Sequence, residues 1–305
     1  MTTEDTRLKR PRDAGRGGEQ ELVERDGAYV TTELSREELT QRVARILRDD
    51  VHVITPERPR IILATGRCRV GSTALANVFG LSGAAAFYQP IKTIMRHVIQ
   101  DKPFRQPLRF DSEAGVVFFK ETFGPYVDIE CTFDPLEALL RSGYPPELIS
   151  VVGLERRPAL SYDSWLENWG SVVERGQLLR NFLAASRQNR RVQETARAAG
   201  VAYAPFHYEW IVDRAQAFRY LEQTQKLGEG FLQPATEAWG DRGDLWSENS
   251  AIRHFEEAEV FLTKDPHIKL DGYIFQTREL RHATPDEIAA IAELGLPEAP
   301  PIPAA

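Results

Sequence analysis

Two short segments of the chain carry positively charged and hydroxyl side chains at spacings that suit the binding of an anion. The first is a loop with a glycine at each end and two arginines inside, followed by two hydroxyl residues: Gly66, Arg67, Arg69, Gly71, Ser72 and Thr73. Guanidinium groups bind phosphate or sulfate oxygens in pairs, and a helix that begins after such a loop points its amide groups at the same place. The segment therefore predicts a site for a phosphorylated or sulfated ligand.

The two glycines have the spacing of a Walker A loop, but Ser72 stands where a nucleotide kinase has lysine. Thr73 occupies the hydroxyl position that usually binds magnesium. Because Arg67 and Arg69 supply positive charge inside the loop, an anion can be held there without a metal ion. The alternative for this stretch is a tight strand-to-helix turn whose arginines face solvent.

The second segment begins with an apolar run, residues 149–154, that suits a buried parallel strand. Arg156 comes at the carboxyl end of this strand, where open α/β sheets bind ligands, and Pro158 can begin a helix. Ser164 lies two helical turns beyond Arg156, so both side chains can face the same crevice. For Arg156 by itself, a surface salt bridge is the alternative.

The first segment, which reads CRVGSTAL, resembles the 5′-phosphosulfate loop of the sulfotransferases that use 3′-phosphoadenosine 5′-phosphosulfate (PAPS). The resemblance implies that four residues grip the phosphosulfate: Arg69, Gly71, Ser72 and Thr73. The chain departs from the family where it usually has proline, serine and often tryptophan: Cys68, Val70 and Ala74. The resemblance also implies that the three other residues of this stretch contact the cofactor: Arg67, Val70 and Ala74.

The same resemblance extends to the other end of the cofactor. Arg156 and Ser164 match the family's 3′-phosphate site. Tyr208 matches a tyrosine that lies near the adenine, and the alternative for Tyr208 is an ordinary core aromatic. Glu209, next in the chain, is expected to anchor loop backbone or to pair with an arginine. The family often closes the 3′-phosphate site with an Arg-Lys-Gly loop, which this chain lacks, and three residues are candidates to replace it: Lys269, Arg278 and Arg281.

A further strand is expected over residues 116–119, and it delivers Lys120 and Glu121 to the carboxyl edge of the sheet. The segment FFKET resembles the family segment that carries a lysine and then the catalytic base. Glu121 is therefore the expected general base, because a carboxylate in a partly dry pocket has a raised pKa. A salt bridge from Glu121 to Lys120 or to a loop arginine is the alternative. On the substrate side of the same edge, the candidates are Tyr88, Gln89 and Lys92.

The elements that must position these residues alternate along the chain. Strands are expected over 61–64, 84–88, 116–119, 149–154 and 201–208, and helices over 36–48, 72–81, 135–141, 174–199, 211–225 and 284–294. Such alternation predicts a three-layer α/β/α, P-loop-like fold with a central, mostly parallel sheet of about five strands and a helical cap. Pro205 predicts an edge or end position for the last strand.

The sequence predicts a single sulfotransferase-like domain over residues 31–296, a disordered polar tail at 1–30 and a Pro/Ala tail at 297–305. The irregular stretch 101–114 is expected to form a mobile flap over the acceptor. The 305 residues are 42% hydrophobic, which is enough to bury one large α/β core.

Charge and cysteine content limit the classes of function. The formal net charge of −7 and a pI near 5.5 argue against a general nucleic-acid binder. Cys68 and Cys131 are too few for a disulfide framework, and no Cys/His spacing indicates a metal site. No apolar stretch is long enough to span a membrane and no signal peptide begins the chain, so a cytoplasmic protein is expected.

These features predict a sulfotransferase that moves a sulfuryl group from PAPS to a hydroxyl or amine of a small-molecule or glycan acceptor and leaves adenosine 3′,5′-bisphosphate (PAP). Arg69 would stabilise the charge that develops on the leaving phosphate, and Glu121 would take the acceptor proton. A P-loop nucleotide kinase and a non-catalytic nucleotide-binding protein are the alternatives. The sequence does not identify the acceptor, and it leaves a homodimer open.

Overall fold

The computed structural model of the chain describes residues 34–49, 58–99, 101, 115–237, 252–253, 279–296 and 298–303. Several expectations fall outside these residues, namely the polar tail at 1–30, the flap over 102–114, Lys269 and Arg278. Most of the last third, in which the helical cap is expected, also lies outside them. The described residues include both segments that are predicted to bind an anion and the strands that carry them.

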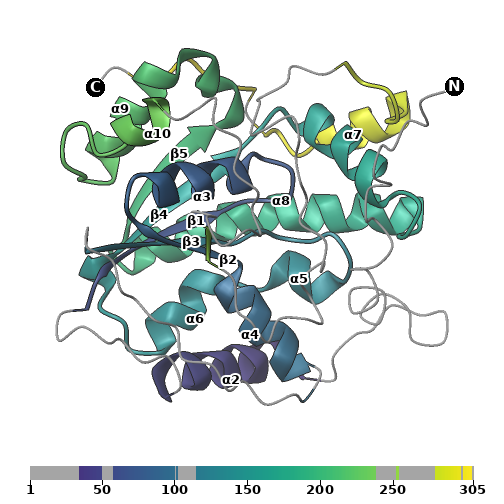
Figure 1. Cartoon of the computed structure of the whole chain (residues 1–305). Helices are drawn as coiled ribbons and strands as arrows, with labels where there is room; N and C mark the ends of the chain where they lie inside the picture. Colours follow the sequence, from purple (N-terminus) through teal and green to yellow (C-terminus); the bar gives the residue numbers. More distant parts are fainter. Residues whose placement is uncertain are drawn as a thin grey trace, which may run out of the picture.

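The centre of the molecule is a sheet in which every pair of neighbouring strands is parallel (Figure 1). The strands are β1 (Arg60–Thr65), β2 (Ala85–Tyr88), β3 (Val116–Lys120), β4 (Ile149–Glu155), β5 (Ala202–His207) and the two-residue β6 (Ile252–Arg253). They lie in the order β5-β4-β1-β3-β2-β6. The five longer strands are the five that the sequence predicts. As Pro205 indicates, β5 lies at an edge of this sheet.

Helices cover both faces of the sheet. They are α2 (Arg36–Asp49), α3 (Ser72–Leu81), α4 (Pro90–Ile99), α5 (Asp128–Thr132), α6 (Pro135–Arg141), α7 (Pro158–Trp169), α8 (Arg175–Ala198), α9 (Arg214–Thr224), α10 (Gln233–Glu237) and α11 (Pro285–Ala292), with 3₁₀ turns η1 (Pro146–Leu148) and η2 (Tyr208–Asp213). One core cluster joins α3, α9 and α10 to one face, and a second joins α2, α4, α5, α6 and α8 to the other. The result is the expected three-layer α/β/α fold (Figure 1).

Alternation along each strand divides its side chains between these two clusters. In β1, Ile61 and Leu63 belong to the cluster with α4 and α8, whereas Ile62 and Ala64 belong to the cluster with α3. In β3, Phe119 faces the α4 side and Phe118 stacks on Phe79 of α3. Because both faces are covered, the strands read as continuous apolar runs rather than as alternating ones.

The crossover that leaves β1 and the later crossovers run in opposite directions along the sheet, so the carboxyl end of β1 is a topological switch point. The chain leaves β1 for β2 through α3 on one face, whereas the crossovers from β2 to β3, β4 and β5 run in the opposite direction on the other face. Right-handed crossovers require this change of face. The end of β1 therefore lies between diverging helices, which is where open α/β sheets bind ligands.

Helix boundaries follow local signals closely. The capping box at the start of α2 is formed, since Glu38 N donates to Ser35 Oγ at 3.2 Å and Ser35 N donates to Glu38 Oε2 at 2.9 Å. The helices α3 and α6 have the predicted bounds. Two features differ from the prediction: the short helix α5 lies in a stretch expected to be a connection, and the helix expected over 211–225 begins as the 3₁₀ turn η2.

The end of the described chain is attached to the domain. The helix α11 lies against α7, and Arg190 of α8 donates to the carbonyls of Leu294 and Gly295 at 2.8 Å. Trp210 Nε1 donates to the Pro300 carbonyl at 2.6 Å, and Ile302 packs on the cluster that contains α3. The stretch expected to be a tail therefore contacts η2 and the core. None of the described helices combines the length and the apolarity needed to cross a bilayer.

Candidate functional site

The loop between β1 and α3 is held against β4 by its two glycines. A Cβ added to Gly66 would lie 2.6 Å from the Leu154 carbonyl oxygen, so only glycine allows the loop to lie this close to the neighbouring strand. Gly71 has a φ of 81°, in the left-handed region, and forms the N-cap of α3. These two positions fix the loop at the carboxyl end of β1.

The first turn of α3 offers amide groups at the same place. Gly71 provides no side-chain cap for the helix, which begins at Ser72, and among the described residues no side chain accepts from its first amides. Thr73 is partly exposed there, whereas the side chains of Val70 and Ala74 are buried. Val70 and Ala74 can therefore contribute only backbone to a ligand. A helix N-terminus of this kind favours an anion through its amides and its dipole.

Arg69 joins this loop to α7. Its backbone has a φ of 72°, which is uncommon for a residue other than glycine and is typical of functional sites. Its Nε donates to Ser164 Oγ at 3.0 Å, and Ser164 is buried on α7. The predicted phosphosulfate residue and the predicted 3′-phosphate residue are therefore in direct contact.

Arg156 makes the second link between the two segments. Its Nη1 donates to the carbonyl oxygen of Arg69 at 3.0 Å, and its guanidinium lies over the ring of Tyr208, 4.4 Å from the centroid. The side chain is only 6% exposed. The structure thus brings together four residues that the sequence singled out, from the β1–α3 loop, the end of β4, α7 and η2: Arg69, Arg156, Ser164 and Tyr208.

Arg67 corrects one expectation from the sequence. The side chain expected to bind the anion is fully buried, donates from Nη1 to Glu155 Oε2 at 2.9 Å and lies over the Phe182 ring. The ion pair neutralises its charge, so Arg67 supports the loop, and the positive charge available to a ligand comes from Arg69 and Arg156.

Two further residues hold the site together and were missed at the sequence level. Trp165 Nε1 donates to the Cys68 carbonyl at 2.7 Å, which ties α7 to the loop a second time. Asn189 of α8 donates to Glu155 Oε1 at 2.7 Å, so it shares the carboxylate that binds Arg67. A signal for Asn189 was present, because an amide stands on the apolar face of a predicted helix. Trp165 gave no such signal, since a buried aromatic residue usually indicates only core packing.

Two further carboxylates, Glu209 and Asp163, attach backbone segments near the site. Glu209 Oε1 accepts from the backbone N–H of Arg157 at 2.9 Å, which confirms that it anchors loop backbone. Asp163, beside Ser164, accepts three backbone N–H groups from residues 281–283, so the segment that begins at Arg281 is attached to α7. Of the three candidates to replace the Arg-Lys-Gly loop, Arg281 is the one within the described residues.

Glu121, the expected general base, has its carboxylate turned to the start of α4. Its Oε1 accepts from Ile91 N at 2.6 Å and its Oε2 accepts from Lys92 N at 3.3 Å. Burial raises the pKa of Glu121 to about 7, while these two amides and the neighbouring Lys120 and Lys92 oppose that rise. Among the described residues, Glu121 forms an ion pair neither with Lys120 nor with a loop arginine. The carboxylate acts as a cap for α4, and a base role stays a prediction.

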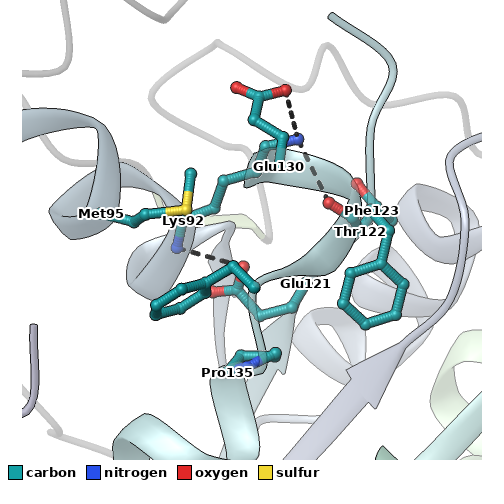
Figure 2. Close-up of a pocket in the computed structure, with 8 residues that line it drawn as sticks. Lys92, Met95, Glu121, Thr122, Phe123, Glu130 and Pro135 are labelled. Atoms are coloured by element: carbon teal, nitrogen blue, oxygen red, sulfur yellow. Dashed lines mark hydrogen bonds and ion pairs between the residues drawn. The ribbon is translucent and has the colours of Figure 1, made fainter. Parts of the chain in front are cut away.

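A small cavity of about 10 Å³ lies next to Glu121, and its size suits roughly one water molecule (Figure 2). Lys92 lines it from α4 and donates to the carbonyls of Thr122 and Gly124 at 3.2 and 2.6 Å, and its Nζ lies 3.2 Å from Glu130 Oε2. The Lys92 side chain is thus buried, and its amine is held by contacts within the protein. The Thr122 hydroxyl donates to Gln89 Oε1 at 2.6 Å, so Gln89 also has a partner at this edge.

The donor set of the site consists of two guanidinium groups, the hydroxyls of Ser72, Thr73 and Ser164, and the amides of a helix N-terminus, which is a set suited to phosphate and sulfate oxygens. Among the described residues, no group of three or more His, Cys, Asp or Glu side chains could hold a metal ion. Neither a protein-family model, nor a curated protein, nor a solved structure matches the chain.

Proposed function

We propose that the protein is a sulfotransferase that moves a sulfuryl group from PAPS to a hydroxyl or amine of a small-molecule or glycan acceptor. The observation that carries the proposal is the pair of contacts that Arg69 makes with the second segment, through its Nε to Ser164 and through its carbonyl to Arg156. A nucleotide with phosphate groups at both its 3′ and 5′ positions needs two anion sites side by side. The two segments supply such sites within one hydrogen-bonded unit.

The loop would bind the 5′ end of the nucleotide. Arg69 and the amides of the first turn of α3 direct positive charge to one place, and the Ser72 and Thr73 hydroxyls lie at the start of that turn. When bound, PAPS supplies an activated sulfuryl group on its 5′-phosphate. Donors fixed in advance around the phosphate stabilise the charge it gains as it leaves, and such stabilisation is usually the largest part of catalysis.

The second segment would bind the other end. Arg156 and Ser164 are buried at the carboxyl end of β4 and on α7, and both are suited to the 3′-phosphate. The Tyr208 ring already stacks with the Arg156 guanidinium, so an adenine can extend the same stack. Recognition of a 3′-phosphate distinguishes PAP and PAPS from ATP, which lacks that group.

A calorimetric titration of the wild type with PAP and with ATP plus magnesium tests the proposal. We expect PAP to bind more tightly, and we expect Arg156→Ala to weaken PAP binding by about 2 kcal/mol, or roughly thirtyfold, as the loss of a charge-assisted contact implies. Arg157→Ala is the matched control, because this neighbouring side chain is exposed and should leave PAP binding unchanged.

Other outcomes would contradict the proposal. Tighter binding of ATP with magnesium would favour a P-loop nucleotide kinase, although Ser72 replaces the lysine that such a loop needs. PAP binding without sulfate transfer from PAPS to any member of a broad panel of hydroxyl and amine acceptors, followed by mass spectrometry, would favour a non-catalytic nucleotide-binding protein.

A further inference from the structure

The end of β3 presents two ionisable side chains to opposite faces of the sheet. Phe119 and Glu121 face the α4 side, where Glu121 caps the helix. Phe118 faces the α3 side, onto which the loop 66–71 leads, and Lys120, two positions further, lies over Tyr88, which packs on the same cluster. Strand alternation therefore directs Lys120, and not Glu121, toward the face that carries the proposed sulfuryl site.

Lys120 has surroundings unlike those of the other buried lysine at this edge. It is 3% exposed, and its Nζ lies 3.7 Å from the centroid of the Tyr88 ring. Within the described part of the chain its amine makes neither an ion pair nor a hydrogen bond, whereas the Lys92 amine binds two carbonyls and Glu130. A buried amine without a carboxylate partner lowers the stability of the folded protein, so a purely structural role does not explain it.

The charged and titratable groups around Lys120 come from α4, the loop 66–71, the end of β3 and β2. Burial, the largest effect, lowers the pKa of Lys120 to about 7, and the like charges of Lys92 and Arg96 on α4 act in the same direction. Cys68 in the loop and Glu121 oppose them, and the face of the Tyr88 ring stabilises the ammonium form. Near neutral pH the amine can therefore both hold and release a proton.

We propose that Lys120, rather than Glu121, accepts the proton of the sulfate acceptor. The inference rests on the proposed function. In the step, the acceptor oxygen or nitrogen forms a bond to sulfur while the bond from sulfur to the bridging oxygen of the 5′-phosphate breaks. The electron pair of that bond stays on the phosphate, and the acceptor proton moves to neutral Lys120 Nζ. The resulting ammonium lies over the Tyr88 ring.

A titration of the free protein tests the inference without any turnover. The chain has seven lysines, so protein labelled with carbon-13 in its lysine side chains gives few signals, and the signal lost in Lys120→Arg identifies Lys120. We expect its Cε shift to titrate with a midpoint of about 7. A midpoint near the usual lysine value of about 10 would overturn the inference. Lys226, which is exposed, is the internal reference.

Transfer assays with an acceptor from the hydroxyl and amine panel give the second test. Lys120→Met should keep PAP affinity and lower kcat by about a hundredfold or more, as loss of a general base implies. Lys120→Arg should be equally impaired, because arginine keeps the charge but does not release its proton. Methylamine or ethylamine should restore part of the activity of Lys120→Ala.

Glu121→Gln tests the rival candidate base at the same strand end. It should lose some stability, because the cap of α4 is weakened, but it should keep most of its kcat. The inference would be overturned if Lys120→Arg kept its activity. It would also be overturned if Glu121→Gln lost activity about a hundredfold and added amines did not rescue Lys120→Ala. Failure of the wild type to bind PAP would instead contradict the proposed function, so the two failures are distinguishable.

Discussion

Arg69 is hydrogen-bonded to the second of the two predicted anion-binding segments through both its side chain and its backbone. Its Nε donates to Ser164 Oγ and its carbonyl accepts from Arg156 Nη1, each at 3.0 Å. The loop 66–71, Arg156 and α7 are therefore joined in one hydrogen-bonded unit. Preorganisation lowers the entropy cost of ordering side chains when a ligand binds.

Ser164→Ala should weaken PAP binding by about tenfold, because it removes both a hydroxyl at the proposed 3′-phosphate site and the partner that orients Arg69. Calorimetry with PAP measures the effect. Ser161→Ala, one turn earlier on α7, is the control: Ser161 is fully buried and its hydroxyl has no partner within the described residues, so PAP affinity should not change. Equal losses in the two variants would show that α7 is merely perturbed.

Gly66→Ala should destabilise the fold by about 1–3 kcal/mol, as overpacking of a close backbone contact does. The added Cβ would meet the Leu154 carbonyl oxygen at 2.6 Å, so the loop must move away from β4. Urea unfolding measures the loss. Gly228→Ala, where a Cβ meets nothing within 4 Å, should leave the free energy of unfolding unchanged within about 0.5 kcal/mol. An unaltered Gly66→Ala protein would contradict the packing argument.

Arg67→Met should cost about 3–5 kcal/mol of stability, because it leaves the Glu155 carboxylate in a mostly buried position without its cation. The double variant Arg67→Met/Glu155→Gln should recover much of this loss, since the remaining amide can still accept from Asn189 without carrying a charge. Urea unfolding of the two single variants and the double variant gives the coupling energy. Simple additivity would be inconsistent with a buried ion pair.

Glu287 should make stability depend on pH in the acid range. The hydrogen bond from Arg175, helped by Thr284 and Tyr162, holds the pKa of Glu287 at about 2, below its usual 4.5. Since the folded state lowers this pKa, the stabilisation is complete above about pH 4.5 and is lost as the pH falls toward 2. The stability gap between wild type and Glu287→Gln should therefore be larger at pH 6 than at pH 3 in urea unfolding. Glu293→Gln, which changes an exposed carboxylate near the end of α11, should show no such gap.

Much of the fold was predictable because its signals are local. Apolar runs mark the strands, capping residues mark the starts of α2 and α11, and Pro205 indicates the edge position of β5. The strand-loop-helix junctions at Gly66–Ser72 and at Arg156–Pro158 follow from short stretches of sequence. Parallel strands then bring these junctions to one edge, so the meeting of Arg69 with Ser164 could also be anticipated.

The roles of individual charged residues could not be predicted in the same way. Arg67 and Arg69 are two positions apart in one loop, yet Arg67 is neutralised by Glu155 from β4, and Arg69 reaches Ser164 on α7. Glu121 and Lys120 are adjacent, yet one carboxylate caps α4 and one amine lies over Tyr88. The sequence by itself determined the layered fold and which residues stand at the strand ends, because these depend on local pattern. Only the tertiary structure decided the partner and burial of each ionisable group, because those partners come from strands and helices far apart in the chain.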